Sequence, residues 1–182
     1  MKLTANAEEK ARGIRLVLLD VDGVLTDGRL TYQEDGKELK TFHALDGMGI
    51  RLAQQAGIEI GVITGRRSGA VEHRCKELGM TEIHQGNWRK LPILEEILAR
   101  RGLSLEQVAF VGDDLPDLAV LRRVGLAVTV ADARPEVLEV ADASSERKGG
   151  CGAVREILEA LIKAQGKWEP ILSSYESGQD GR

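Results

Sequence analysis

Residues 16–24, Leu-Val-Leu-Leu-Asp-Val-Asp-Gly-Val, decide the fold of this 182-residue chain. The first four residues are apolar and predict a short buried strand, and Asp20 and Asp22 follow at its carboxyl end. Two carboxylates so close together repel each other and lose hydration when buried, so a cation or a shared proton must offset them. The pattern fits a nucleophile at Asp20, an acid/base at Asp22 and Mg²⁺ held between them and other acids. Because such a pair also occurs in surface turns, its partners decide the interpretation.

Further polar residues follow two other predicted strands and open one predicted helix. The apolar run 58–63 leads into Thr64-Gly65-Arg66, the run 108–111 leads into Gly112-Asp113-Asp114-Leu115-Pro116-Asp117, and Lys90 opens an apolar-periodic helix. In a doubly wound sheet of strand order 3-2-1-4-5, the first, second and fourth strands are neighbours, and ligands bind beyond their carboxyl ends. The sequence therefore predicts an α/β fold with a doubly wound, Rossmann-like parallel sheet and one crevice that gathers these side chains.

In this order, the DxDGV, TGR, Lys and GDDxxD segments resemble the haloacid dehalogenase superfamily of phosphatases over about residues 14–165. Singly, each has a plain structural explanation: a turn at Asp20, a strand-ending turn at Thr64, a solvated lysine at Lys90 and a helix cap at Asp113-Asp114. Jointly, these explanations require four polar strand or helix ends to converge by coincidence. The resemblance implies hydrolysis of a phosphate monoester.

The chemistry of phosphoryl transfer gives each residue a role. Asp20 would attack phosphorus in line and form an aspartyl-phosphate, while Asp22 would protonate the leaving group and then activate water. Mg²⁺ held by Asp20, the backbone carbonyl of Asp22 and Asp113 would neutralise the facing anions. Thr64 would hold phosphoryl oxygens, and Lys90 would bring positive charge to them.

Two more acids, Asp114 and Asp117, are not expected to touch the substrate themselves. They would orient Lys90 or metal-bound water. Arg89 is an alternative to Lys90, which is preferred because it heads the helix.

Arginine residues near the predicted crevice indicate the substrate class. Arg66 follows the Thr64-Gly65 turn, and Arg74 projects from a predicted helix at about 68–78. Because arginine forms paired hydrogen bonds with carboxylates, these residues favour a sugar acid phosphate. An ion pair of Arg66 with an acid of the chain itself is an equal alternative. The expected substrate-binding residues are Asp22, Gly65, Arg66, Arg74 and Lys90.

The spacing of the motifs leaves no room for a cap domain. The first gap, residues 23–63, already holds a hairpin at about 29–44, a helix at about 47–56 and a strand, and the second gap, 65–89, holds a helix and a strand. A domain needs about 50 residues or more, so the fold is predicted to be capless. Selectivity must then come from elsewhere, and a neighbouring subunit is the expected source.

The two ends of the chain are interpreted differently from its middle. Residues 1–13 are expected to form a polar, frayed leader, residues 14–165 the phosphatase domain, and residues 166–182 a tail without periodicity. An isolated two-stranded hairpin is marginally stable in water, which favours pairing between copies of the chain. Aromatic residues, which often anchor interfaces, occur in the hairpin and the tail at Tyr32, Phe42, Trp168 and Tyr175.

Within the superfamily, the chain closely resembles the 3-deoxy-D-manno-octulosonate 8-phosphate (KDO 8-phosphate) phosphatase family. The features that carry this resemblance are the capless length, the hairpin and the segments DVDGVLTDG, Asp46-Gly-Met-Gly-Ile50, ITGR and GDDLPD. That resemblance implies Mg²⁺ dependence, a homotetramer with a hairpin barrel, a tail that can reach a neighbour's site, and a role in lipopolysaccharide precursor synthesis. The related nonulosonate 9-phosphate phosphatases are an alternative, although they favour Glu-Lys where this chain has Arg66-Arg67. A non-catalytic phospho-acceptor like a two-component receiver is disfavoured, because its aspartate would end the third strand, here His84-Gln85.

Composition narrows the partners further. A hydrophobic content of 42% and a charged content of 30% are typical of an ordinary globular chain. The net charge of −4 and the pI near 5.5 argue against nucleic acid as a partner. The chain contains no apolar run of the ~20 residues that a membrane span requires and no signal-like apolar segment, so we expect no membrane contact and a cytoplasmic location. Cys75 and Cys151 lack metal-ligand spacing.

Overall fold

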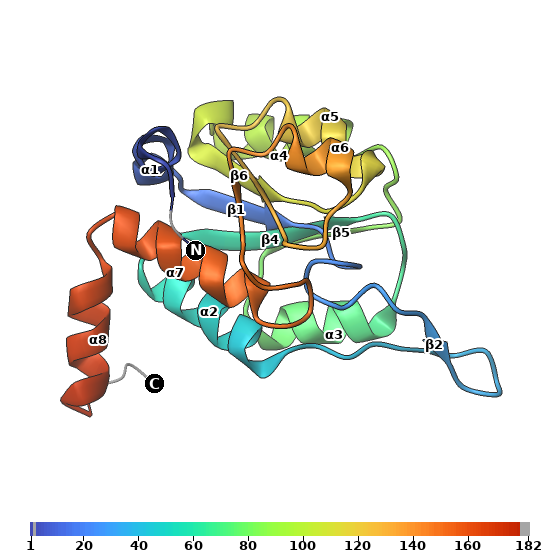
Figure 1. Cartoon of the computed structure of the whole chain (residues 1–182). Coiled ribbons are helices and arrows are strands. Elements are labelled where there is room, and N and C mark those ends of the chain that lie inside the picture. The colour runs from blue at the N-terminus through green and yellow to red at the C-terminus, as the bar shows by residue number, and fades with distance from the viewer. Residues whose placement is uncertain (2, 179–182) are drawn as a thin grey trace.

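A six-stranded parallel sheet forms the centre of the molecule in the computed structural model, which describes residues 1 and 3–178 (Figure 1). The strand order is β5-β4-β1-β6-β7-β8, which confirms the predicted 3-2-1-4-5 arrangement and adds a short strand at one edge. The strands are β1 (Leu16–Leu19), β4 (Glu59–Thr64), β5 (Glu82–Gln85), β6 (Val108–Val111), β7 (Leu126–Thr129) and β8 (Ala143–Ser144).

The central strand β1 is entirely buried because helices cover both faces of the sheet. One face carries α2 (Ala44–Gln55), α3 (Gly69–Glu77) and α7 (Ala153–Ala164). The other carries α4 (Lys90–Arg101), α5 (Leu118–Leu121) and α6 (Pro135–Leu138), with the 3₁₀ turns η1 (Leu105–Gln107) and η2 (Leu115–Asp117) in the connections. One face of α7 is buried and packs in the core, and it carries Val154, Ile157, Leu158, Leu161 and Ile162.

Helix α4 is held firmly at its carboxyl end, and this matters because its first residue is Lys90. The helix ends at Gly102, whose φ of 62° is the left-handed conformation that glycine adopts most easily. Near this end, the buried Glu82 of β5 accepts hydrogen bonds from Arg100 at 2.7 Å and Arg101 at 2.6 Å. Burial alone would raise the pKa of Glu82, but hydrogen bonds from Arg100, His84 and Arg101 outweigh it and lower the pKa to about 2.

Helices α2 and α7 pack closely because small and polar residues meet at their contact. A Cβ on Gly49 would lie 2.8 Å from the Cα of Arg155, so only glycine permits this approach. The buried carboxylate of Asp46 accepts a hydrogen bond from the backbone N–H of Arg155 at 2.8 Å. Asp46 therefore caps the first turn of α7 from a neighbouring helix.

The hairpin, which lies between β1 and α2 in the sequence, projects from the body of the molecule (Figure 1). Its strands β2 (Thr31–Tyr32) and β3 (Glu38–Leu39) are antiparallel, and its turn contains Gly36 with a φ of 81°. The paired strands are shorter than the predicted segment 29–44. Large side chains are exposed on it at Leu30, Tyr32 and Leu39.

Both ends of the chain differ from the prediction. The expected frayed leader contains α1 (Ala5–Arg12), which begins after Thr4, whose hydroxyl accepts a hydrogen bond from the N–H of Ala7. Ala7 and Ala11 are fully buried, and the helix packs against α7. Burial of these small side chains holds the segment in place.

The expected irregular tail contains α8 (Trp168–Glu176), which follows α7 and extends away from the sheet (Figure 1). Ile171 is buried, and the Trp168 ring lies 4.9 Å from the Lys163 ammonium. Residues 179–182 of the predicted tail lie outside the described residues. Among the described helices, none is long and apolar enough to cross a membrane.

Candidate active site and metal centre

The loop after β1, residues 20–28, carries Asp20 at the carboxyl edge of the sheet, and we call it the catalytic loop because it holds the expected nucleophile. The N–H of Asp20 donates to the carbonyl of Val111 at 2.8 Å, which extends the β1–β6 pairing by one residue. The chain then turns back on itself, because the carbonyl of Val21 accepts from the N–H groups of Val24, Leu25 and Thr26. Asp20 is thereby fixed between the two strands that flank the predicted crevice.

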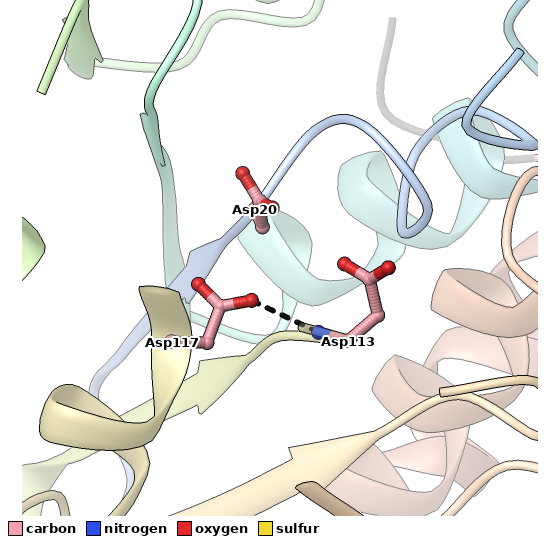
Figure 2. A group of neighbouring side chains, drawn as sticks. All are labelled: Asp20, Asp113 and Asp117. Atoms are coloured by element: carbon pink, nitrogen blue, oxygen red, sulfur yellow. Dashed lines mark hydrogen bonds between the residues drawn. The ribbon is translucent and has the colours of Figure 1, made fainter. Parts of the chain in front are cut away.

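Three carboxylates meet at this edge, from Asp20, Asp113 and Asp117 (Figure 2). One oxygen of each lies within 4.8 Å of the others. Asp117 is fully buried, and its Oδ2 accepts from the N–H groups of Asp113 at 3.0 Å and Asp114 at 3.3 Å. The turn η2 therefore folds back so that its own acid supports the end of β6.

Lys90 reaches the same carboxylates from the first residue of α4. Its Nζ lies 2.8 Å from Oδ1 of Asp20 and 2.6 Å from Oδ1 of Asp117, and its side chain is buried. Burial lowers the pKa of Lys90, but the charges of Asp20 and Asp117 outweigh it and raise the pKa above its ordinary value. Lys90 is therefore a cation fixed beside the expected nucleophile.

One lysine does not balance the charge of three acids. Burial, opposed in part by Lys90 and reinforced by Asp117, raises the pKa of Asp20 to about 6. Burial and the charges of Asp20, Asp117 and Asp114 raise the pKa of Asp113 to about 8. The centre thus holds more negative charge than it can stabilise without a cation.

The surroundings of Asp113 fit a divalent cation. Its Oδ1 is buried and has no hydrogen-bond partner within the described chain. A Cβ at Gly23 would lie 2.1 Å from Oδ2 of Asp113, so glycine is required where the catalytic loop meets this carboxylate. Hard divalent cations such as Mg²⁺ bind oxygen ligands of this kind.

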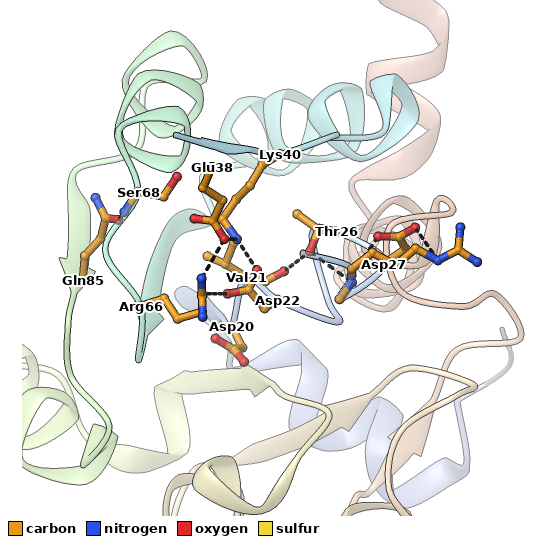
Figure 3. A network of polar contacts seen from close by, with 12 residues as sticks. Asp20, Val21, Asp22, Thr26, Asp27, Glu38, Lys40, Arg66, Ser68 and Gln85 are labelled. Carbon is orange, nitrogen blue, oxygen red and sulfur yellow. Dashed lines mark hydrogen bonds and ion pairs between the residues drawn. The ribbon is translucent and has the colours of Figure 1, made fainter. Parts of the chain in front are cut away.

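Asp22 lies outside the carboxylate cluster. Its side chain turns toward the hairpin, where Oδ1 contacts Nζ of Lys40 and Oδ2 lies 3.8 Å from Nε of Arg66 (Figure 3). This leaves the backbone carbonyl, as the sequence suggested, for any contact of Asp22 with a metal. The carboxylate itself faces the hairpin and does not join the cluster.

The remaining predicted residues are divided between the site and its rim. Thr64 is buried at the end of β4, beside the loop 85–90, since its carbonyl accepts from the N–H of Asn87 at 3.0 Å. Gly65 lies against the indole of Trp88, which would come within 2.9 Å of a Cβ at that position. Asp114 is exposed and accepts from the N–H of Leu115, so it caps η2 rather than touching Lys90.

Arg66 pairs with an acid of its own chain. Its Nη2 donates to Glu38 at 2.9 Å and to the Tyr32 hydroxyl at 3.1 Å. Arg74 pairs with Glu77 at 2.8 Å and lies close to Gly47. Both arginines line a groove of about 1040 Å³ between the hairpin and α3, together with Lys40, Phe42 and His73.

Sequence reasoning missed the hairpin's contribution to the site, which comes from Glu38 and Lys40. The two residues are separated by one position, so they can face the same side of an extended strand. That pattern was visible, but nothing local in the sequence identified Asp22 as their partner.

The loop before α7 also contacts the catalytic loop, at Gly149 and Gly150. The N–H of Gly150 donates to the carbonyl of Val24 at 3.0 Å. A Cβ at Gly149 would lie 1.7 Å from the carbonyl oxygen of Gly23, so the two backbones touch directly.

Comparisons with known proteins agree with this geometry. A family model described as haloacid dehalogenase-like hydrolase matches residues 77–157. The 3-deoxy-D-manno-octulosonate 8-phosphate phosphatase KdsC of Escherichia coli K12 is 47% identical over 165 residues, which cover 91% of this chain and 88% of that protein.

Solved structures show the same similarity. A probable yrbi family phosphatase from Pseudomonas syringae pv. phaseolica superposes with a TM-score of 0.93 at 46% identity, covering 95% of this chain and 98% of that one. The 3-deoxy-D-manno-octulosonate 8-phosphate phosphatase of Moraxella catarrhalis, solved with magnesium ion, phosphate ion and KDO, gives a TM-score of 0.92 at 38% identity, covering 94% and 99%.

The fold and its carboxylate centre are those of a haloacid dehalogenase-like hydrolase. Within that class, the chain belongs to the family of 3-deoxy-D-manno-octulosonate 8-phosphate phosphatases. The predicted superfamily and family are both confirmed.

The raised pKa values predict how metal and pH act together on stability. Because Asp20 and Asp113 hold protons more tightly when folded than when unfolded, the metal-free protein should lose stability as pH rises from about 4 to 8. Mg²⁺ competes with those protons, so the rise in Tm that it causes should be larger at pH 8 than at pH 5. Thermal melts with and without Mg²⁺ measure this difference.

Asp113→Asn provides the control, because it removes one charge and one ligand. In that variant the Mg²⁺-induced rise should shrink at pH 8. An equal rise at both pH values in the unmodified protein would contradict the prediction.

Proposed function

We propose that this protein hydrolyses 3-deoxy-D-manno-octulosonate 8-phosphate to the free sugar acid and phosphate, with Mg²⁺ as cofactor. The observation that carries the proposal is the convergence of Asp20, Asp113, Asp117 and Lys90 at one edge of the sheet, in a chain of this family. A phospho-accepting receiver is not supported, because β5 ends at Gln85, whose side chain accepts from the N–H of Ser68. We place the reaction in the cytoplasm and in lipopolysaccharide precursor synthesis, as the family resemblance implies.

In the first step, a carboxylate oxygen of Asp20 forms a bond to phosphorus. The bond from phosphorus to the sugar oxygen breaks, and that oxygen takes the proton of the Asp22 carboxyl group. Lys90 lies 2.8 Å from Asp20, so its charge is already present where the phosphoryl oxygens arrive. The Thr64 hydroxyl and adjacent N–H groups would hold the same oxygens.

In the second step, water attacks phosphorus and the bond to Asp20 breaks. The Asp22 carboxylate, left by the first step, takes the proton of the water. Free phosphate leaves, and both aspartates return to their starting forms.

The Mg²⁺ ligands would be the carboxylates of Asp20 and Asp113 and the backbone carbonyl of Asp22. The bound ion would supply positive charge that lets anionic phosphate approach an anionic nucleophile. Both oxygens of Asp117 already accept hydrogen bonds, from Lys90 on one side and two N–H groups on the other. Asp117 therefore serves as the support for Lys90 and the end of β6.

Asp20→Asn should lower phosphate release from the sugar acid phosphate by about 10³-fold or more, because it removes the nucleophile. The variant should retain the fold, since the change also removes one buried negative charge. Release of phosphate, measured with Mg²⁺ across a panel of phosphorylated sugar acids, tests the function and the residue together.

Asp27→Asn is the matched control, because Asp27 lies in the same loop but is exposed and near Arg29. It should retain wild-type activity. Activity of Asp20→Asn within tenfold of wild type would exclude Asp20 as nucleophile.

For the sugar acid, Arg66 remains the proposed carboxylate partner, with Arg74 and Gly65 at the same groove. The Nε of Arg66 is buried without a hydrogen-bond partner in the described chain, so the guanidinium has capacity beyond Glu38. A substrate carboxylate would compete with Glu38 for this cation.

Arg66→Ala should raise KM for the sugar acid phosphate by the equivalent of about 2–3 kcal/mol, and much less for an aryl phosphate. Steady-state kinetics on both substrates measure this, and Arg51→Ala, at an exposed arginine outside the groove, provides the control. Equal losses on the two substrates would place Arg66 on the phosphate or in the scaffold.

We further propose a homotetramer built around the hairpins. The hairpin has little to pack against within one chain. Its strands β2 and β3 have two residues each, and it exposes Leu30, Tyr32 and Leu39. The open groove beside it would be closed by a neighbouring copy.

Light scattering should therefore give the mass of four chains. Deleting residues 167–182, which removes α8, should preserve this mass but change KM or product release. A monomer with full and selective activity would refute the assembly.

A further inference from the structure

Lys40 has a buried side chain on a hairpin whose residues are mostly exposed. Its side chain is 2% exposed, although the neighbouring Leu39 is exposed. Its Nζ contacts Oδ1 of Asp22 and lies 3.3 Å from Oε1 of Glu38 (Figure 3). A buried ammonium is costly unless paired, and this one is paired with the acid/base of the reaction.

Both oxygens of Asp22 face cations from outside the catalytic loop. Oδ1 faces Lys40, and Oδ2 faces Arg66 at 3.8 Å. The carboxylates of Asp20, Asp113 and Asp117 form the neighbouring cluster, which Asp22 does not join. Repulsion from that cluster disfavours an approach by Asp22, but repulsion alone does not specify one orientation.

Glu38 links the two cations and fixes their spacing. Its Oε1 accepts from Arg66 at 2.9 Å and lies 3.3 Å from Lys40. Lys40 keeps a carboxylate partner even if a substrate displaces Arg66. The direction of the Asp22 side chain therefore depends mainly on Lys40.

We infer that Lys40 is a positioning residue, which holds the Asp22 carboxylate out of the metal centre and toward the leaving-group oxygen. The inference rests on the proposed phosphatase function, in which the sugar oxygen takes the proton of Asp22 as its bond to phosphorus breaks. Lys40 touches neither phosphorus nor the transferred proton. It acts through Asp22.

The test compares leaving groups that do and do not need a proton. In Lys40→Met, kcat/KM for the sugar acid phosphate should fall about 10²-fold, the usual contribution of a general acid. For 2,4-dinitrophenyl phosphate, whose leaving group departs as an anion, it should change less than about threefold. Lys76→Met changes an exposed lysine outside the groove and the hairpin, and it should leave both values unchanged.

A double-mutant cycle shows whether Lys40 acts through Asp22. In an Asp22→Asn background, Lys40→Met should lower kcat/KM for the sugar acid phosphate by no more than about twofold further. Equal losses on both substrates, full additivity with Asp22→Asn, or no loss at all would overturn the inference. If Lys40→Met fails to fold, Lys40→Gln serves in the same comparison.

Unfolding of the metal-free protein gives a readout that does not depend on turnover. Lys40→Met should lower the urea midpoint, and in the Asp22→Asn background the lowering should be at least halved, because the unpaired carboxylate is gone. An equal lowering in both backgrounds would contradict the pairing. If the wild type hydrolyses neither substrate, the proposed function fails, while the urea comparison still tests the Lys40–Asp22 pair.

Discussion

The gathering of three carboxylates beside one buried lysine is the constraint on which the rest of this structure depends. Asp20, Asp113 and Asp117 reach one point only because β1 and β6 are adjacent and η2 folds back on β6. Lys90 reaches the same point because α4 starts there, and Glu82 anchors the opposite end of that helix to the edge strand. Much of the architecture therefore holds carboxylates together against their mutual repulsion. The excess negative charge that results favours binding of a divalent cation.

The hairpin also contributes side chains to the site, within an insertion too short to hold a cap domain. Residues 20–58, all of them described, contain only the catalytic loop, the hairpin and α2. Within this short insertion, Glu38 and Lys40 reach back to the catalytic loop and engage Asp22. Asp20 thus faces Lys90 and Asp22 faces Lys40, so each aspartate has its own cation, as the proposed division between attack and proton transfer requires.

The sheet order, the strand ends and the start of α4 at Lys90 could be predicted because buried parallel strands and their polar ends leave local patterns. Helix α1 was missed because only alanines face the core, so it lacks an apolar stripe. Helix α8 was missed although Trp168, Ile171, Leu172 and Tyr175 have helical spacing, because Pro170 obscures a first turn that tolerates proline. The pairs Lys40–Asp22 and Arg66–Glu38 join segments 18 and 28 residues apart, and no local pattern encodes such partners.

The direct backbone contact between the loop before α7 and the catalytic loop has a consequence for the order in which the protein matures. The loop of Asp20 is supported by Gly149 and Gly150 and by a helix that starts at Ala153, all far along the chain from Asp20 itself. A growing chain therefore contains Asp20 and Asp22 well before it contains the segment that fixes their loop. The acidic site should be complete only after residues 149–153 have been synthesised and have folded against that loop.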